Sequence, residues 1–243
     1  MESETLRSPK AGPGQGRLFP TVSSRVSGSE LCPAGADLPG SVPAAQVAST
    51  VLASPPRWID VAGGVLPASR WRPATTVGDL HWMATPVTAA LLTSVSETPS
   101  TAGWSLVPAT GLTWQQAALV AAQLGGPLPT SAEWEWMAGA GVRRYPWGDE
   151  EPSTPGGRRA NVRGFGPDAP TPVGAYPQGA TPAGILDVAG NVWEWTSTPV
   201  PGGYVVRGGS YRALSLYARC AFANEVPAVL ASPGIGLRVV RQP

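Results

Sequence analysis

The chain has 243 residues and a formal net charge of +1, which allows a sizeable hydrophobic core but gives no electrostatic reason to expect nucleic acid or an anionic membrane as partner. No run of 18 apolar residues occurs and the acidic N-terminus lacks the apolar segment of a secretory signal, so we expect no membrane span and, by default, a cytoplasmic location. Cys32 and Cys220 lie far apart, so no disulfide framework is expected. Sixteen of the seventeen basic residues are arginine, a bias that a GC-rich bacterial genome or a thermophile produces.

The composition changes near residue 56. Residues 1–55 are rich in Pro, Gly, Ser and Ala and contain no tryptophan, whereas all ten tryptophans lie between Trp58 and Trp195. A stretch so poor in large apolar side chains buries too little area to offset chain entropy. We therefore predict a poorly ordered arm over 1–55, or alternatively a docking arm for a partner, and one folded domain over 56–243.

Capping patterns predict three helices. Thr88 is suited to the N-cap of a short helix. Thr113 with Gln116, and Thr130 with Glu133, each form the Thr-x-x-Gln/Glu pattern of a capping box, and glycines close both apolar runs that follow. The spacing predicts amphipathic helices that pack aromatic side chains on a sheet, with no catalytic content.

The remaining segments predict loops and short strands. Residues 145–181 are rich in Gly, Pro and Asp at turn positions and predict a long ordered loop. Short apolar or alternating runs predict strands over 204–207, 218–221 and 236–240.

Five motifs follow one another in the second half of the chain. They are 128–135 (LPTSAEWE), 145–148 (YPWG), 160–162 (ANV), 172–174 (PVG) and 184–195 (GILDVAGNVWEW). In type and order they resemble the motifs of the formylglycine-generating-enzyme family, the sulfatase-modifying-factor domain. The resemblance implies an α+β, C-type lectin-like fold of the formylglycine-generating-enzyme type, with low regular secondary structure and short helices on a small antiparallel sheet.

Glu194 lies between two tryptophans in the sequence. If its carboxylate is buried, the negative charge must be stabilised by hydrogen bonds or by a cation. The resemblance implies a structural Ca²⁺ site made largely of backbone oxygens, which suit this hard cation. The alternative is that Glu194 only accepts backbone N–H bonds. The implied ligands are Gly190, Asn191, Val192 and Glu194, with Asn161, Val162 and Asp168 for a second ion.

The redox groups of the family's enzymes have no counterpart at the expected places. Copper-dependent relatives use two cysteines just after the Gly-Gly-Ser-Tyr element, but residues 212–218 contain no thiol. Iron-dependent relatives need a histidine cluster, and His81 is the only histidine. We therefore expect no copper or iron site and predict that the chain is not an enzyme.

A binding function is the main alternative to catalysis. The same scaffold carries the variable proteins of diversity-generating retroelements, and their variable region corresponds to 211–234, between the fixed segments 208–210 and 235–238. Mutating the adenines of an AAC codon cannot produce Lys, Gln, Met, Trp or Glu. The first four are absent from 211–234, and Glu225 is the exception.

These observations predict a ligand-binding protein with a hypervariable surface, whose ligand is an unidentified protein or other macromolecule and not a nucleic acid. The alternatives are a formylglycine-generating-type oxidase or its inactive relative, and a structural subunit. Apolar residues of the segment could also belong to the core. The predicted binding residues are Tyr211, Arg212, Ala213, Leu214, Leu216, Tyr217, Phe222, Asn224, Glu225, Val226, Leu230, Ser232, Pro233 and Gly234.

Overall fold

A computed structural model describes residues 55–70, 72–95 and 106–243. All of them belong to the compact unit Val42–Pro243. The arm predicted over 1–55 therefore lies outside the described residues except for Pro55, and so does Cys32.

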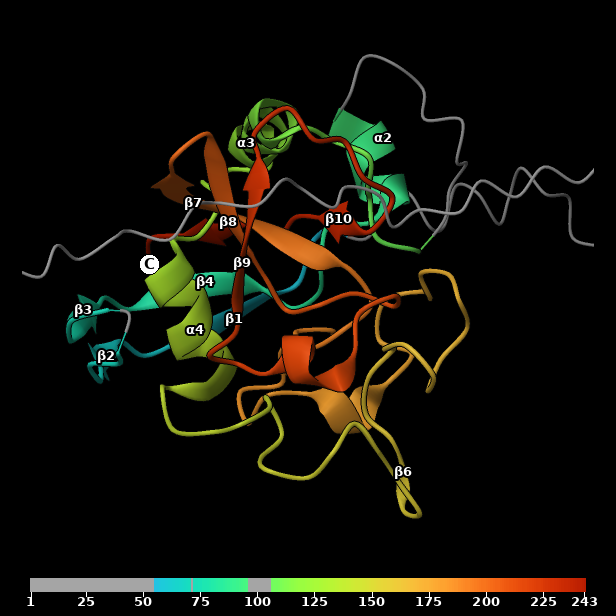
Figure 1. The fold of residues 1–243 in the computed structure, drawn as a ribbon. Coiled ribbons are helices and arrows are strands. Elements are labelled where there is room, and N and C mark those ends of the chain that lie inside the picture. The colour runs from blue at the N-terminus through green and yellow to red at the C-terminus, as the bar shows by residue number, and fades with distance from the viewer. Residues whose placement is uncertain (1–54, 71, 96–105) are drawn as a thin grey trace, which may run out of the picture. The chain divides into compact units, whose positions relative to one another are not determined.

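A three-stranded antiparallel sheet joins the start of the described domain to its end. Its strands are β1 (Trp58–Val61), β4 (Leu80–Met83) and β11 (Val240–Arg241), in the order β1-β4-β11. A separate hairpin of β2 (Gly64–Leu66) and β3 (Thr75–Val77) leaves the sheet between β1 and β4 (Figure 1).

The second sheet contains a strand that begins in the 184–195 motif and a strand from the predicted variable segment 211–234. It consists of β7 (Trp193–Val200), β8 (Gly203–Arg207), β9 (Ala223–Pro227) and β10 (Ile235–Gly236), in the order β10-β7-β8-β9. The β10–β7 pair is parallel and the others are antiparallel.

The strand predicted over 204–207 is confirmed as β8, but the one over 218–221 is wrong. There the chain forms a 3-10 turn, η2 (Ser215–Ala218), and the strand begins only at Ala223. The buried positions Ala218 and Cys220 suit a compact turn as well as an alternating strand. The strand predicted over 236–240 is split between β10 and β11, because the chain leaves β7 of the second sheet after Gly236 and pairs with β4 of the first sheet from Val240.

The three predicted helices are confirmed. They are α2 (Ala89–Val95), α3 (Trp114–Gln123) and α4 (Ser131–Gly139). Both predicted capping boxes are complete, with side-chain and backbone bonds running in both directions. The Thr88 hydroxyl accepts the backbone N–H of Leu91 at 3.1 Å, which caps α2.

Two apolar clusters divide the core between the helices. One packs α3 residues such as Val120 against Trp195 and Leu237, and the other packs Trp134 of α4 against Trp82. In Figure 1, α3 and α4 lie well apart along the second sheet. Helices α3 and α4 thus each have their own set of buried side chains, while α2 packs against the same cluster as α3.

The segment over 145–181 is mostly irregular but ordered, as predicted. It contains a two-residue hairpin of β5 (Ser153–Thr154) and β6 (Gly157–Arg158) and the short turn η1 (Pro177–Gly179). Tyr145 stacks on Trp147 with ring centroids 5.1 Å apart and belongs to a small third cluster. Among the described residues, no helix has the length and apolar character needed to cross a membrane.

Candidate ligand-binding face

The buried carboxylate of Glu194 is neutralised by an arginine. Arg238 Nη2 donates to Oε1 at 2.7 Å and Arg238 Nε to both oxygens at 3.1 Å, while Trp134 Nε1 donates to Oε2 at 2.7 Å. Both charged residues have 0% exposure. Glu194 is therefore paired with a guanidinium and an indole, and not with the cation or the backbone N–H groups that the sequence analysis considered.

Glu194 consequently does not fit the predicted calcium site. Both of its oxygens already accept hydrogen bonds, and a second cation beside Arg238 would add repulsion. Calcium ligation by the other three residues, Gly190, Asn191 and Val192, stays a prediction. The Asn191 carbonyl accepts the Tyr211 N–H at 2.9 Å, so it already has one partner.

Asn161 is better suited to hold a cation. Its side chain is buried and its Nδ2 donates to the Ala169 carbonyl at 2.9 Å, but no described donor reaches its Oδ1. A buried oxygen without a donor fits a hard cation. Asp168 is exposed and lies 3.6 Å from Arg212. The second predicted calcium site, at Asn161, Val162 and Asp168, therefore stays a prediction that the orphaned oxygen supports.

Two glycines of the motifs allow close packing behind the 211–234 segment. Gly190 has φ +77°, and a Cβ there would lie 2.4 Å from the Asn161 carbonyl oxygen. Gly209 has φ +76°, and its Cβ would lie 3.1 Å from the backbone nitrogen of Ala218. Only glycine fits both the positive φ and the space without strain.

A second buried ion pair lies behind the same segment. Arg207 Nη2 donates to Glu135 Oε2 at 2.9 Å, and Arg207 Nε donates to Ser131 Oγ at 2.8 Å. Its Nη1 also donates to the carbonyls of Cys220 and Phe222, at 3.3 and 3.1 Å. Burial lowers the pKa of Arg207, and the Glu135 carboxylate opposes this shift. Through these hydrogen bonds, Arg207 links residues 220–222, which lead into β9, to helix α4.

Residues 211–234, which we call the loop face, expose apolar and aromatic side chains. Leu214 is 47% exposed, and Leu216 and Leu230 are each 39% exposed. Phe222 is half-buried and meets Tyr217 edge to face, with ring centroids 4.8 Å apart. Such clusters are typical of interaction surfaces.

The structure sorts the predicted binding residues into three groups. The prediction that Tyr211 is an exposed binding residue is wrong, because its side chain is only 4% exposed. Its backbone N–H donates to the Asn191 carbonyl, and its ring lies beneath the Arg212 guanidinium. Tyr211 therefore supports the loop face from the inside. The exposed group comprises Arg212, Leu214, Leu216, Asn224, Glu225, Leu230 and Pro233. The half-buried group comprises Ala213, Tyr217, Phe222, Val226, Ser232 and Gly234.

Sequence reasoning missed Trp193 as part of this surface. It is half-buried, and its ring centroid lies 6.2 Å from that of Phe222. Trp193 belongs to the GNVWEW motif, but the motif does not indicate that its side chain lies at the binding surface. Only the fold shows that β7 brings Trp193 beside the loop face.

The expectation that the chain holds no copper or iron site stays a prediction, and the surroundings of Cys220 and His81 bear on it. Cys220 is buried, and burial raises the pKa of its thiol to about 12, so the thiol is protonated at neutral pH. His81 pairs with Asp60 on the first sheet. In the part of the chain that the structure describes, no three His, Cys, Asp or Glu side chains are grouped to hold a metal.

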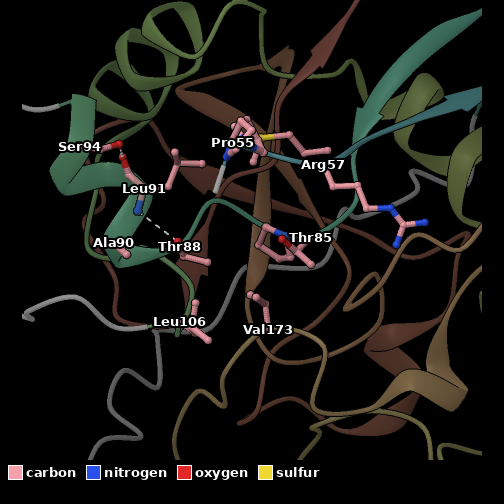
Figure 2. Close-up of a pocket in the computed structure, with 12 residues that line it drawn as sticks. Pro55, Arg57, Thr85, Thr88, Ala90, Leu91, Ser94, Leu106 and Val173 are labelled. Atoms are coloured by element: carbon pink, nitrogen blue, oxygen red, sulfur yellow. Dashed lines mark hydrogen bonds between the residues drawn. The ribbon is translucent and has the colours of Figure 1, made fainter. Parts of the chain in front are cut away.

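Two hollows lie outside the loop face. One of about 190 Å³ lies beside α2 and is lined by residues such as Thr85, Leu91 and Val173, while the Arg57 guanidinium extends away from them (Figure 2). The other, of about 490 Å³, is apolar and lies between α3 and Leu128. Neither is lined by a predicted binding residue.

The fold and this surface define a C-type lectin-like domain of mixed α and β structure with one elaborated loop face. The chain belongs to the family described as the sulfatase-modifying factor enzyme 1-like domain (FGE-sulfatase), whose model matches residues 65–243.

Curated relatives of the chain are enzymes. It is 44% identical over 100 residues to a hercynine oxygenase of Mycolicibacterium thermoresistibile, a match that covers 38% of this chain and 21% of that protein. It is 43% identical over 104 residues to a formylglycine-generating enzyme of Streptomyces coelicolor, covering 37% and 32%. The chain thus spans about a fifth to a third of the length of these relatives. The prediction that it is not an enzyme is contradicted by these relatives: missing cysteines and histidines at expected positions were too narrow a criterion.

Among solved structures, Treponema denticola variable protein 1 has the same fold, with a TM-score of 0.62 and 17% identity over 76% of this chain and 95% of that one. At this identity the likeness concerns the fold alone.

Proposed function

We propose that this chain recognises the substrate of an oxidative enzyme of its family, and that the loop face is where the substrate binds. The observation that carries the proposal is the cluster of exposed leucines and half-buried aromatic rings on a segment fastened from behind by Arg207. Aromatic side chains combine contact area with few rotatable bonds, which favours binding. The identity of 43–44% to an oxygenase and to a formylglycine-generating enzyme supports the oxidative part.

Replacement of Tyr217 and Phe222 by alanine tests this function. We expect hercynine or a cysteine-containing peptide, titrated calorimetrically into the full chain, to bind saturably, and Tyr217→Ala with Phe222→Ala to weaken binding by about tenfold or more. Dioxygen uptake is measured in parallel with added iron(II) or copper(I). Because both rings are half-buried, the variant should lose less stability than the about 3–5 kcal/mol that a buried aromatic costs.

Val65→Ala is the matched control, because Val65 is 59% exposed on β2, outside the loop face. It should bind like the unaltered chain. If neither probe binds and no dioxygen uptake is seen, the proposed function is wrong.

A second candidate function is a diversified binding surface. The residue types of 211–234 favour it, since they match the products of adenine mutagenesis except at Glu225. On this hypothesis the ligand is a protein or other macromolecule.

Sequencing around the gene tests diversification. We expect a reverse-transcriptase gene nearby and a near-copy of codons 211–234 that differs only at adenines. A gene without such a copy would rule the hypothesis out while leaving the binding of a fixed substrate untouched.

A further inference from the structure

Strand β9 is an open edge of the second sheet. It pairs with β8 on one side only, and no other described strand pairs with its outer side. In Figure 1 it lies beside β8. All of its residues are exposed except the half-buried Val226. The edge therefore lies inside the surface to which we assign ligand binding.

The register shows which backbone groups of β9 point outward. Val205 of β8 stands opposite Glu225. The Val205 carbonyl accepts the Thr196 hydroxyl at 2.8 Å, so it is turned toward β7 and away from β9. In an antiparallel ladder, two opposed residues that do not bond to each other turn their N–H and C=O groups outward.

Glu225 therefore presents its N–H and C=O at the open edge, and by alternation Ala223 does the same. Pro227, the next residue in this alternation, has no N–H to offer. No described residue bonds to the N–H groups of Ala223 or Glu225. Among the described residues, the N–H and C=O groups of Ala223 and Glu225 thus have no hydrogen-bond partner at this edge.

Apolar side chains flank this edge along the chain. Leu216, Tyr217 and Phe222 precede β9, and Val229 and Leu230 follow it, with Val229 82% exposed. In the middle stands the exposed carboxylate of Glu225. An extended peptide could bond to the backbone and place alternate side chains against these groups.

We propose that the ligand of the loop face is an extended peptide segment that adds to β9 as a further strand, with apolar side chains and a basic side chain near Glu225. The proposal rests on the proposed function and names the ligand class of the same surface. Backbone hydrogen bonds to Ala223 and Glu225 supply part of the affinity, and contacts with the flanking apolar side chains determine which peptide sequences bind.

A comparison of two substitutions at one position isolates the backbone bond. Random linear dodecapeptides displayed on phage are selected on the full chain, and the most enriched is synthesised with a fluorophore for anisotropy titration. Glu225→Ala and Glu225→Pro both remove the carboxylate, but only Glu225→Pro removes the outward N–H. We expect Glu225→Pro to bind about tenfold more weakly than Glu225→Ala.

An N-methyl scan of the same peptide on the unaltered chain gives a second measurement that does not depend on the folding of a variant. Methylation should weaken binding at every second residue of the paired segment and have little effect between them. Equal binding by the two Glu225 variants, or an N-methyl scan without this period, overturns strand addition.

The two proposals fail in different ways. If Tyr217→Ala and Phe222→Ala weaken binding while the scan shows no period of two, the loop face binds its ligand by side chains alone and only strand addition is wrong. If no dodecapeptide is enriched, the assignment of a peptide ligand is wrong, and the titrations with hercynine decide the proposed function separately.

Discussion

Replacing Arg238 with methionine should lower the free energy of unfolding by about 3–5 kcal/mol, because it leaves the Glu194 carboxylate buried without its counter-charge. The substitution also removes the donor to the Met83 carbonyl at 3.0 Å, which holds β4 against the chain leading to β11. Urea denaturation followed by tryptophan fluorescence measures the loss. For a domain of ordinary stability this is a large share of the total.

The double variant Arg238→Met with Glu194→Gln is the control. The amide carries no charge but still offers an oxygen to Trp134 Nε1, so the double variant should be more stable than Arg238→Met alone. A loss below about 1 kcal/mol in Arg238→Met would mean that the buried charge is compensated by another group.

Replacing Arg207 with methionine should destabilise the domain by about 3 kcal/mol or more and loosen the loop face. Glu135 would lose its partner at 2.9 Å, and the carbonyls of Cys220 and Phe222 would lose their donor. Amide hydrogen exchange, read by mass spectrometry over peptides that span 219–227, should become faster than in the unaltered chain. Ligand binding to the loop face should weaken in parallel.

Arg72→Met is the matched control for this second prediction. Arg72 lies 3.8 Å from the same Glu135 carboxylate but makes no bond to the 220–222 backbone. It should leave exchange over 219–227 unchanged. If Arg207→Met also leaves that exchange unchanged, Arg207 does not fasten the loop face.

Local features of the fold were predictable because their causes lie within a few residues. Thr113 and Thr130 begin helices by bonds to partners three positions away, and both capping boxes form as expected. The family and the C-type lectin-like fold also followed from short motifs. The strand expected over 218–221 failed for the opposite reason, since tertiary packing around Cys220 favours a turn that local alternation does not distinguish from a strand.

The supports of the candidate site could not be predicted, because they join residues that are distant in the sequence. Glu194 and its arginine are 44 positions apart, and Glu135 and Arg207 are 72 apart. The sequence showed a glutamate between tryptophans but not which group neutralises it. For the same reason Tyr211 was assigned to the surface, although its backbone bond to Asn191 draws it inward.

The bonds that Arg207 makes to the loop face have a consequence for evolution and for protein engineering. They reach main-chain oxygens of residues 220 and 222, which every amino acid possesses. Substitutions at exposed neighbours such as Leu214 or Leu216 therefore leave the anchor chemically unchanged. We therefore expect substitutions at these exposed positions to cost little folding stability, so that the positions can be randomised in a library without loss of the fold.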